Sequence, residues 1–403
     1  MNPAAEIEFF QTTVHAPIEQ VFRSFTRGVG LQEWLSSGAR TIPRAGGMIT
    51  MWWNNGYYMM GEFTRLEPNE FISFSWQGRG EPQSSMVHIQ LSPENDSVKI
   101  EITHQGLGSE EIWVEARKAI RKGWEDGLKN LKSVLENGKD IRVMNRPGMG
   151  IYPAELSEDM ISEHGFPVRK GIVLKDVIEG LGAEQAGLKK DDLVTEIDGN
   201  SITNIETLMQ FLGRQTLGDH INVTYYRGAE KRTTLLELKT LPVPEVPDTQ
   251  KEFLEKLETI YATSYKLLKE SIAGVSDEAA SWKPAPKEWS IKETLAHLIH
   301  TERDNQLWLH AKILDEDFVW LDNTLERGLA TVAAYPTLDE LLHEVHKAQQ
   351  ETLAFIKHIP EALVNRKTTF WFLAQGILTS DTHIQEHIDQ IKQNLRTYQA
   401  RSA

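Results

Sequence analysis

The sequence predicts a multidomain α+β protein: an antiparallel sheet with one long helix, then a small β-sandwich or β-barrel, then a four-helix bundle. Three observations predict this order. Residues 6–106 hold short runs rich in β-branched and aromatic residues, residues 109–137 show helical spacing of apolar residues, and residues 250–400 show four more helical patterns. A chain of 403 residues is also too long for one ordinary core, so we expect three domains.

Two stretches divide the chain. In residues 138–150, GKDIRVMNRPGMG, a long helical pattern stops in glycine and proline. Residues 241–250, LPVPEVPDTQ, alternate proline with small or polar residues, as a stiff linker does. We therefore expect domains over residues 1–140, 145–240 and 251–400, with the proline-rich linker between the second and the third.

The composition excludes several classes of function. The chain holds 58 acidic against 43 basic residues, and a net charge of −15 repels phosphate backbones, so we expect no nucleic-acid partner. No apolar run reaches the roughly 18 residues of a membrane span, and the first residues lack the pattern of a secretion signal, so we expect a cytoplasmic protein. The absence of cysteine excludes disulfides, thiolate ligands and cysteine nucleophiles.

Strands and one helix make up the first domain. Within residues 48–63 the triplet Asn54-Asn55-Gly56 interrupts an apolar run, which predicts a hairpin because Asn-Gly readily takes the positive φ angles of a type I′ turn. Residues 109–137 predict one long helix with a continuous apolar stripe. The stripe consists of Ile112, Ala116, Ile120, Trp124, Leu128, Leu131 and Leu135.

The segments TTVHAPIEQVFRSFT, GLQEWLSSGAR and GEFTRLEPNEFISFSWQG follow one another in the first domain. In this order they resemble the SRPBCC (START-like) helix-grip superfamily, in particular the branch named after activators of a heat-shock chaperone's ATPase. The resemblance covers nearly all of residues 1–140 and implies a cavity between sheet and helix for a small apolar ligand, with plain core packing as the alternative. The candidate cavity residues are Trp52, Tyr57, Met59, Phe74, Trp76, Trp113 and Trp124.

A glycine-rich stretch in the second domain, GLGAEQAG at residues 180–187, raises the question of a dinucleotide site. Such a site needs GxGxxG between a strand and a helix, with an acidic residue further on. Here the spacing is GxGxxxxG and the next strand, LVTEIDG, follows almost at once. We therefore reject a nucleotide site.

The same region has the order of a known peptide-binding domain. The strand GIVLKDV, a short helix ending in AGL, the turn KKDD, the strand LVTEIDG and a helix starting near Thr203 resemble a PDZ domain of the kind attached to bacterial stress proteases. The resemblance implies that the C-terminal peptide of a partner protein adds as a strand, with its carboxylate held by backbone N–H groups. The implied peptide-binding residues are Gly148, Met149, Gly150 and Ile151 in the carboxylate loop, and Leu208, Phe211 and Leu212 in the side-chain pocket.

Proteolysis does not carry over from this resemblance. The chain shows no protease domain, and its GNS triplet at residues 199–201 lacks the Gly-Gly expected after a serine nucleophile. The alternative to peptide binding is a PDZ domain that serves only as an internal spacer.

Two histidines four residues apart mark the last domain. His383 and His387 lie one helical turn apart in DTHIQEHIDQ, so both imidazoles can reach one ion. Ser290 and Glu293 predict a capping box at the start of the second helix, which places His297 one to two turns into it. The core stripe of the last helix is Ile384, Ile388, Ile391 and Leu395.

The stretches EWSIKETLAHLIHTE and DTHIQEH, in the four-helix order, resemble the DinB family, also called the DinB/YfiT-like metalloenzymes, over residues 250–400. In that family one histidine of the second helix and an HxxxH pair of the fourth hold a divalent metal. The resemblance therefore implies His297, His383 and His387 as ligands. Three imidazoles leave coordination positions open, as in catalytic sites, and nickel, zinc, iron or manganese all suit imidazole.

The DinB family includes thiol transferases that use bacillithiol, mycothiol or glutathione, and its members often form dimers. The resemblance implies a metal-dependent thiol S-transferase acting on small electrophiles, in which the other two domains bind ligands or partner proteins, and it implies a homodimer. The residues that would do the catalysis are not identified. Glu293 and Asp304 are considered either as groups near the metal or as a cap and a solvated residue. The alternative function is a non-catalytic stress-response adaptor that uses only its PDZ and SRPBCC domains.

Overall fold

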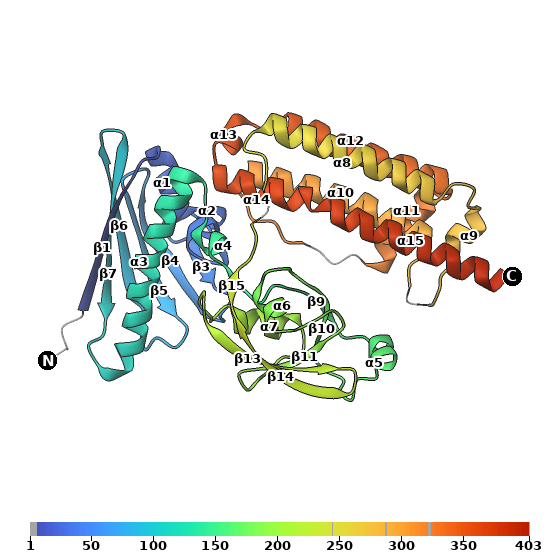
Figure 1. The fold of residues 1–403 in the computed structure, drawn as a ribbon. Coiled ribbons are helices and arrows are strands. Elements are labelled where there is room, and N and C mark those ends of the chain that lie inside the picture. The colour runs from blue at the N-terminus through green and yellow to red at the C-terminus, as the bar shows by residue number, and fades with distance from the viewer. Residues whose placement is uncertain (1–5, 244, 287, 321–323, 403) are drawn as a thin grey trace. The chain divides into compact units, whose positions relative to one another are not determined.

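The computed structural model describes residues 6–402 except 244, 287 and 321–323 (Figure 1). The chain divides into two compact units, Met1–Val243 and Pro244–Ala403. A large antiparallel sheet, a smaller sheet and a helical region follow one another, which confirms the predicted α+β class. Among the described residues, none of the helices combines the length and the apolar character that a bilayer crossing needs.

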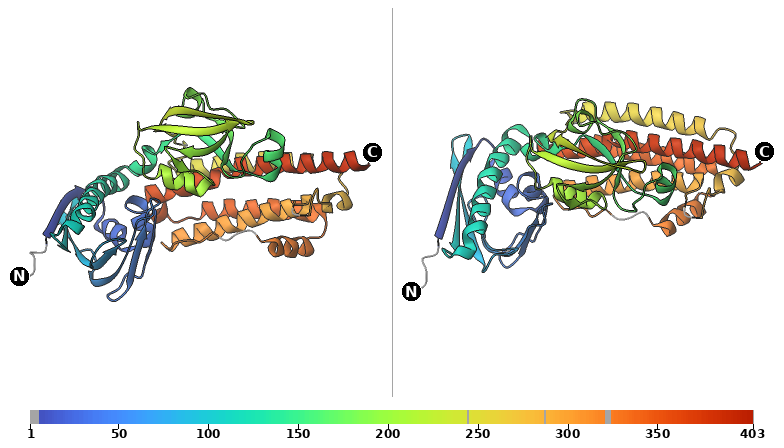
Figure 2. Two further views of the ribbon diagram at one scale, coloured as in Figure 1. Left: turned by 90° about the horizontal axis from the view of Figure 1, so that it is seen from below. Right: turned by 60° about the horizontal axis from the view of Figure 1, so that its bottom comes forward.

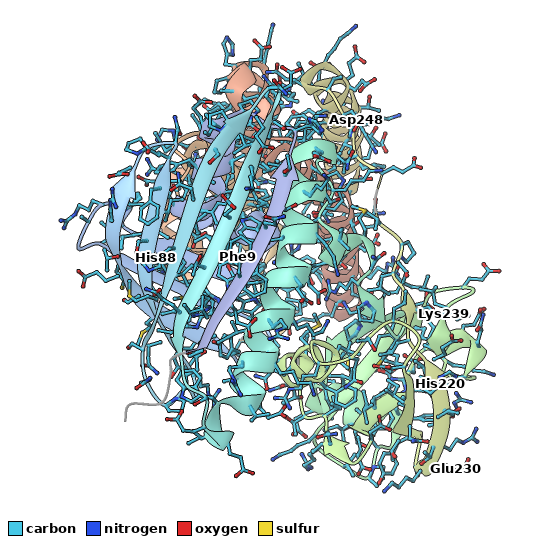
Figure 3. The ribbon with its side chains drawn as sticks, turned by 90° about the vertical axis from the view of Figure 1, so that its left-hand side faces the viewer. Phe9, His88, His220, Glu230, Lys239 and Asp248 are labelled. Atoms are coloured by element: carbon cyan, nitrogen blue, oxygen red, sulfur yellow. The ribbon has the colours of Figure 1, made fainter. Side chains whose placement is uncertain are left out.

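A seven-stranded antiparallel sheet begins the chain, in the order β1-β7-β6-β5-β4-β3-β2. Its strands are β1 Glu6–Val14, β2 Gly38–Thr41, β3 Met48–Trp52, β4 Tyr58–Glu67, β5 Phe71–Gly78, β6 Ser85–Glu94 and β7 Ser97–Leu107. One face packs with the helices α1 (Ile18–Thr26), α2 (Gly28–Trp34) and α3 (Val114–Asn137) around a core that includes Trp34 and Trp124. The opposite face, on which Phe9 and His88 lie, is turned toward the viewer in Figure 3.

The long predicted helix is present, but its first turn differs. Residues Glu111–Trp113 form a 3-10 turn and α3 starts only at Val114. Ile112 is therefore 70% exposed, whereas Ile120, Trp124, Leu128 and Leu131 of the predicted stripe are buried.

The predicted hairpin is also present, but its turn is not type I′. Of the three loop residues only Gly56 has a positive φ, 85°. The Gly56 N–H donates to the Trp53 carbonyl (3.0 Å) and the Trp53 N–H donates to the Tyr57 carbonyl (2.9 Å). A three-residue loop with a left-handed glycine last is the type I turn with a G1 bulge.

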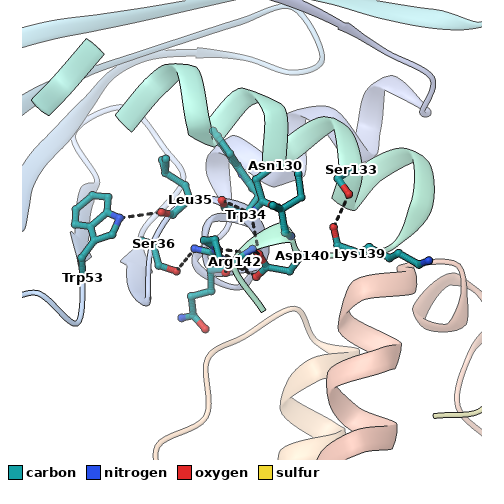
Figure 4. Close-up of polar contacts among 11 residues, drawn as sticks. Trp34, Leu35, Ser36, Trp53, Asn130, Ser133, Lys139, Asp140 and Arg142 are labelled. Atoms are coloured by element: carbon teal, nitrogen blue, oxygen red, sulfur yellow. Dashed lines mark hydrogen bonds and ion pairs between the residues drawn. The ribbon is translucent and has the colours of Figure 1, made fainter. Parts of the chain in front are cut away.

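The buried Asn130 and Asp140 and the exposed Arg142 form a polar group, here called the exit cluster, where the chain leaves α3 (Figure 4). The Asn130 amide donates to the Trp34 carbonyl (2.8 Å) and to the Asp140 carboxylate (2.9 Å), and its oxygen accepts from the Ile141 N–H (2.7 Å). Asn130 thus ties α2 and the segment after α3 to the same helix.

Arg142 completes the exit cluster. Its guanidinium pairs with Asp140 (2.7 Å) and donates to the carbonyls of Ser36 (3.0 Å) and Gln32 (2.6 Å). A planar guanidinium can serve several acceptors at once. The short helix α4 (Ile141–Met144) is therefore fixed to the first domain.

The second sheet has six strands in the order β14-β13-β11-β10-β9, with β12 beside β11. Its strands are β9 Ile151–Glu155, β10 Ile172–Val177, β11 Leu193–Ile197, β12 Asn200–Ser201, β13 His220–Arg227 and β14 Glu230–Glu237. The described strands form an open sheet, so the predicted barrel alternative is wrong. β9 is an edge strand, with no partner but β10 among the strands described.

Short elements complete this domain. Helices α5 (Glu158–His164), α6 (Gly182–Gln185) and α7 (Ile205–Leu212) connect the strands, and β8 (Pro147–Gly148) pairs with β15 (Lys239–Thr240). α7 begins with a capping box in which Asn204 and Thr207 bond each other's backbone N–H.

The third region is a bundle in which α8, α12, α10 and α15 each contact two neighbours in a ring (Figure 2). Its helices are α8 Gln250–Ser271, α9 Asp277–Ser281, α10 Ile291–Ile313, α11 Leu325–Ala334, α12 Leu338–Lys357, α13 Glu361–Val364, α14 Lys367–Leu378 and α15 Ser380–Ser402. The predicted fourth helix is interrupted at Thr379, between α14 and α15. The Ser290–Glu293 capping box is present as predicted.

Glu302 of α10 is a buried carboxyl group inside the bundle. It accepts hydrogen bonds from the hydroxyls of Tyr261 (2.6 Å) and Thr352 (2.9 Å), which come from α8 and α12. Burial raises the pKa of Glu302 to about 7, because the charged form loses its water. Glu302 therefore holds its proton at pH values where an unfolded glutamate has lost it.

The first prediction concerns this carboxyl group. Since the folded-state pKa lies above the unfolded value, the contribution of Glu302 to stability is fully present below about pH 4.5 and is lost as the pH rises to about 7. This one group changes the free energy of unfolding by about 1 to 3 kcal/mol over that window. In thermal unfolding at pH 5 and pH 8, the Glu302→Gln variant should lose this part of the pH dependence, with the exposed Glu351→Gln as control. Identical pH profiles for Glu302→Gln and wild type would contradict the prediction.

The second prediction concerns the exit cluster. Asn130→Ala removes the partner of the buried Trp34 carbonyl and of the partly buried Ile141 N–H, which costs about 2 kcal/mol. Hydrogen exchange of β6 and β7 peptides in the full-length protein should become about 30-fold faster, and Ser133→Ala on the same helix should change it much less. Unchanged exchange in Asn130→Ala would mean that the cluster is not stabilising.

Candidate functional site

His297 from α10 and His383 and His387 from α15 come together in the bundle. The Nε2 atom of His383 lies 3.0 Å from the Nε2 atom of His297 and 3.0 Å from that of His387. All three side chains are half-buried, so the three histidines are partly accessible to solvent. The structure thus joins residues that are separated by 86 positions in the sequence.

This donor set fits a divalent metal ion. Two nitrogen ligands that lie about 2.1 Å from one ion and at right angles to each other are about 3 Å apart, close to the observed Nε2 spacing. The hydrogen bond of His387 supports the same use. Its Nδ1 lies 2.9 Å from the Gln390 side-chain oxygen, so Nδ1 carries the proton and Nε2 presents its lone pair.

The charge state of the three imidazoles also suits a metal. Burial, together with the neighbouring His387 and His383, lowers the pKa of His297 to about 3. Burial likewise lowers the pKa values of His383 and His387. All three side chains are therefore neutral at pH 7, the form that binds metal ions.

Trp289 packs against one side of the three histidines. Its ring centroid lies 4.8 Å from that of His297 and 6.1 Å, nearly parallel, from that of His387. The Trp289 carbonyl accepts a hydrogen bond from Asn394 of α15 (2.9 Å), which fixes the residue before the N-cap of α10. An aromatic ring in this place shields the histidines from water on that side.

The two acidic residues considered near the site are both engaged elsewhere. Glu293 caps α10 and pairs with Lys283 (3.0 Å). Asp304, two turns beyond His297, makes two bonds of 2.7 and 2.8 Å with Arg327 of α11. Asp304 is therefore not simply solvated, and it docks a helix that the sequence pattern does not predict.

The candidate cavity residues of the first domain separate into two groups. Met59, Phe74, Trp76, Trp113 and Trp124 are buried in one core, and Tyr57 packs against it. Trp52 is 37% exposed, because it lies on the opposite face of β3 from the buried Met51, so it does not line the interior. Trp53 packs there instead, with its ring 5.2 Å from Tyr57 and 6.4 Å from Trp76.

This interior also contains polar side chains that the hydrophobic pattern does not reveal. Buried Glu81 accepts from the Tyr57 hydroxyl (2.6 Å) and the Trp76 indole N–H (3.1 Å). Buried His104 accepts from the Trp124 indole N–H (3.2 Å), and burial lowers the pKa of His104 to about 4. In this interior the indole N–H groups of Trp76 and Trp124 are therefore already paired.

The candidate peptide-binding residues of the second domain lie around one end of β9. Gly148, Met149 and Gly150 precede the strand, and Gly150 has a φ of 80°, which favours glycine. On α7, Leu208 is buried while Phe211 and Leu212 are partly buried in the same core. The Glu155 carboxylate accepts from the Ile205 N–H (3.0 Å) and so ties β9 to the start of α7.

Three family models match the chain, in the predicted order. The Activator of Hsp90 ATPase homolog 1-like protein family matches residues 15–136, the PDZ domain residues 147–238 and the DinB superfamily residues 260–391. The chain therefore carries one domain of each kind. The DinB match supports a metal-dependent enzyme family for the bundle.

The curated relatives match only part of the chain. Serine protease Do-like HtrA of Lactococcus lactis subsp. lactis is 32% identical over 100 residues, 24% of this chain and 24% of that protein. A probable periplasmic serine endoprotease DegP-like of Marinomonas sp. is 24% identical over 210 residues, 45% of this chain and 44% of that protein. The chain spans less than half the length of these relatives.

Among solved structures, the Aha1 dimer from Colwellia psychrerythraea is 22% identical with a TM-score of 0.30, and the match covers 33% of this chain and 98% of that one. CalU16 from Micromonospora echinospora is 27% identical with a TM-score of 0.28, and the match covers 32% of this chain and 73% of that one.

The third prediction concerns the hydrogen bond that orients His387. Gln390→Leu removes the acceptor on Nδ1, so the affinity for zinc or nickel should fall about 10- to 100-fold by calorimetric titration. Gln385→Leu, an exposed glutamine on the same helix, should bind as the wild type does. Equal affinities for the two variants would show that Gln390 does not support a metal ligand.

Proposed function

We propose that the bundle is a metal-dependent thiol S-transferase that joins a low-molecular-weight thiol to a small electrophile. The observation that carries this proposal is the convergence of three neutral, half-buried imidazoles. The Nε2 atom of His383 lies 3.0 Å from the Nε2 atom of each of the other two histidines. Three protein ligands leave coordination positions free for a cosubstrate. Nickel, zinc, iron and manganese are all candidates.

A divalent ion bound there would lower the pKa of a neighbouring thiol, so that the thiolate forms near neutral pH. The chain's own residues provide the rest. His297, His383 and His387 would hold the ion, Gln390 fixes the orientation of His387, and Trp289 shields the histidines from water. The thiol loses its proton to solvent, a carbon–sulfur bond forms, and the electrophile releases a leaving group or takes up a proton.

The fourth prediction tests this transfer. The metal-loaded protein should consume bacillithiol, mycothiol or glutathione together with monobromobimane faster than the uncatalysed reaction. Because the chain holds no cysteine, a thiol reagent measures only the thiol groups of the added cosubstrate and none of the protein. The His383→Ala/His387→Ala variant should lose about tenfold or more of this rate.

The exposed His310→Ala variant is the matched control and should keep the wild-type rate. A wild-type protein that binds metal but transfers none of the three thiols would contradict the transferase proposal. It would leave the adaptor as the better description.

We also propose that the second domain binds C-terminal peptides of other proteins and has no proteolytic activity. The supporting observation is the open edge of β9 beside α7, with a glycine-containing loop at its start. An exposed strand edge can accept one more strand, and successive backbone N–H groups can hold a carboxylate. This binding is also what the non-catalytic adaptor would use.

Three further properties belong to the same proposal. The first domain binds a small apolar ligand or a partner protein between its sheet and α3. The chain forms a homodimer. It works in the cytoplasm, where low-molecular-weight thiols are kept reduced.

A further inference from the structure

The hydrogen bonds of Leu174 reveal which way the backbone of β9 faces. Leu174 donates its N–H to the Asp192 carbonyl (2.9 Å) and accepts from the Asp191 N–H (2.8 Å). Both backbone groups of Leu174 therefore point away from β9. In the register of the two strands, Leu174 lies opposite Pro153.

Pro153 must then face the open edge. When one residue of an antiparallel pair points its N–H and C=O away from the partner strand, the residue opposite does the same on its own side. The Gly150 carbonyl, by contrast, accepts from the Ile178 N–H (2.8 Å), on the β10 side. Because strand residues alternate, the outward-facing backbone positions of β9 are Ile151, Pro153 and Glu155.

A proline at the middle of these three positions changes what the edge can offer. Ile151 and Glu155 carry an N–H and a carbonyl, whereas Pro153 has a carbonyl only. Proline is tolerated in a sheet at such an edge because no neighbouring strand needs its donor. For a peptide that adds to this edge, however, one donor of the ladder is missing.

The missing donor falls at a defined place in the peptide. A peptide whose carboxylate sits in the loop of Gly148, Met149 and Gly150 runs antiparallel to β9. Its last residue then lies opposite Ile151 and its third-from-last residue lies opposite Pro153.

We propose that Pro153 is a specificity-determining residue of the peptide groove, because it leaves the carbonyl of the third-from-last peptide residue without a backbone donor. The groove then holds a peptide through its carboxylate, its last residue and the N–H of the third-from-last residue. It discriminates against proline at that third position, where the N–H is needed. This inference rests on the proposed peptide binding of the second domain.

The test uses the full-length protein and fluorescent heptapeptides with free C-termini, selected from a displayed library of random C-termini. Each peptide is paired with an analogue in which an ester replaces the amide after the third-from-last residue. The ester weakens that carbonyl as an acceptor, and the N–H that it removes points away from β9. Dissociation constants are measured for wild type, Pro153→Ala and the control Pro167→Ala, an exposed proline of the same domain.

Pro153→Ala restores the donor and should bind the amide peptides about fivefold more tightly, while Pro167→Ala should match wild type. The ester should cost affinity in Pro153→Ala and little in wild type. A peptide with proline at its third-from-last position should lose most of its binding to the wild-type protein. This measurement does not depend on the folding of any protein variant.

Two results would overturn the inference and leave peptide binding intact: an ester penalty that is equal in wild type and Pro153→Ala, or Pro153→Ala binding no tighter than wild type. If neither the peptides with a free C-terminus nor the amidated peptides bind the wild type, the proposed peptide-binding function itself fails.

Discussion

The packing of α15 against its neighbours is the interaction on which the histidine site depends. Ile384, Ile388 and Ile391 are buried in the bundle core. Because a helical residue turns by about 100° from the one before it, burial of this stripe leaves no freedom in the direction of His383 and His387. On the facing helix, the capping box of Ser290 and Glu293 fixes where α10 starts and therefore where His297 lies.

Local patterns in the sequence predict much of this arrangement. The capping box, the HxxxH spacing and the isoleucine stripe each follow from neighbours three or four positions apart, and all three are present. The resemblance to the DinB family supplies what spacing cannot, the pairing of His297 with two histidines far along the chain. Gln390 has a local signal too, since it lies one turn after His387.

Features that depend on contacts between distant parts of the chain cannot be predicted from such local patterns. Arg327 lies on α11, whose docking depends on Asp304 of another helix. Trp52 and Trp53 are adjacent aromatic residues, and only the register of β3 decides that the second packs inward. Glu81 and His104 are buried polar residues whose partners come from other strands and from α3, so no pattern of apolar residues could place them inside. The turn at Gly56 differs from type I′ because the loop holds three residues rather than two.

Whether a divalent ion binds at the three histidines is the central question for the proposed transferase, because a chain without cysteine has no thiol of its own and would take its sulfur from a cosubstrate. The most direct measurement is elemental analysis of untagged protein, wild type beside His383→Ala/His387→Ala. The wild type should hold about one divalent ion per chain, lost in the variant. No metal in the wild type after loading with nickel, zinc, iron and manganese, or equal metal in both proteins, would contradict a metal centre at these residues.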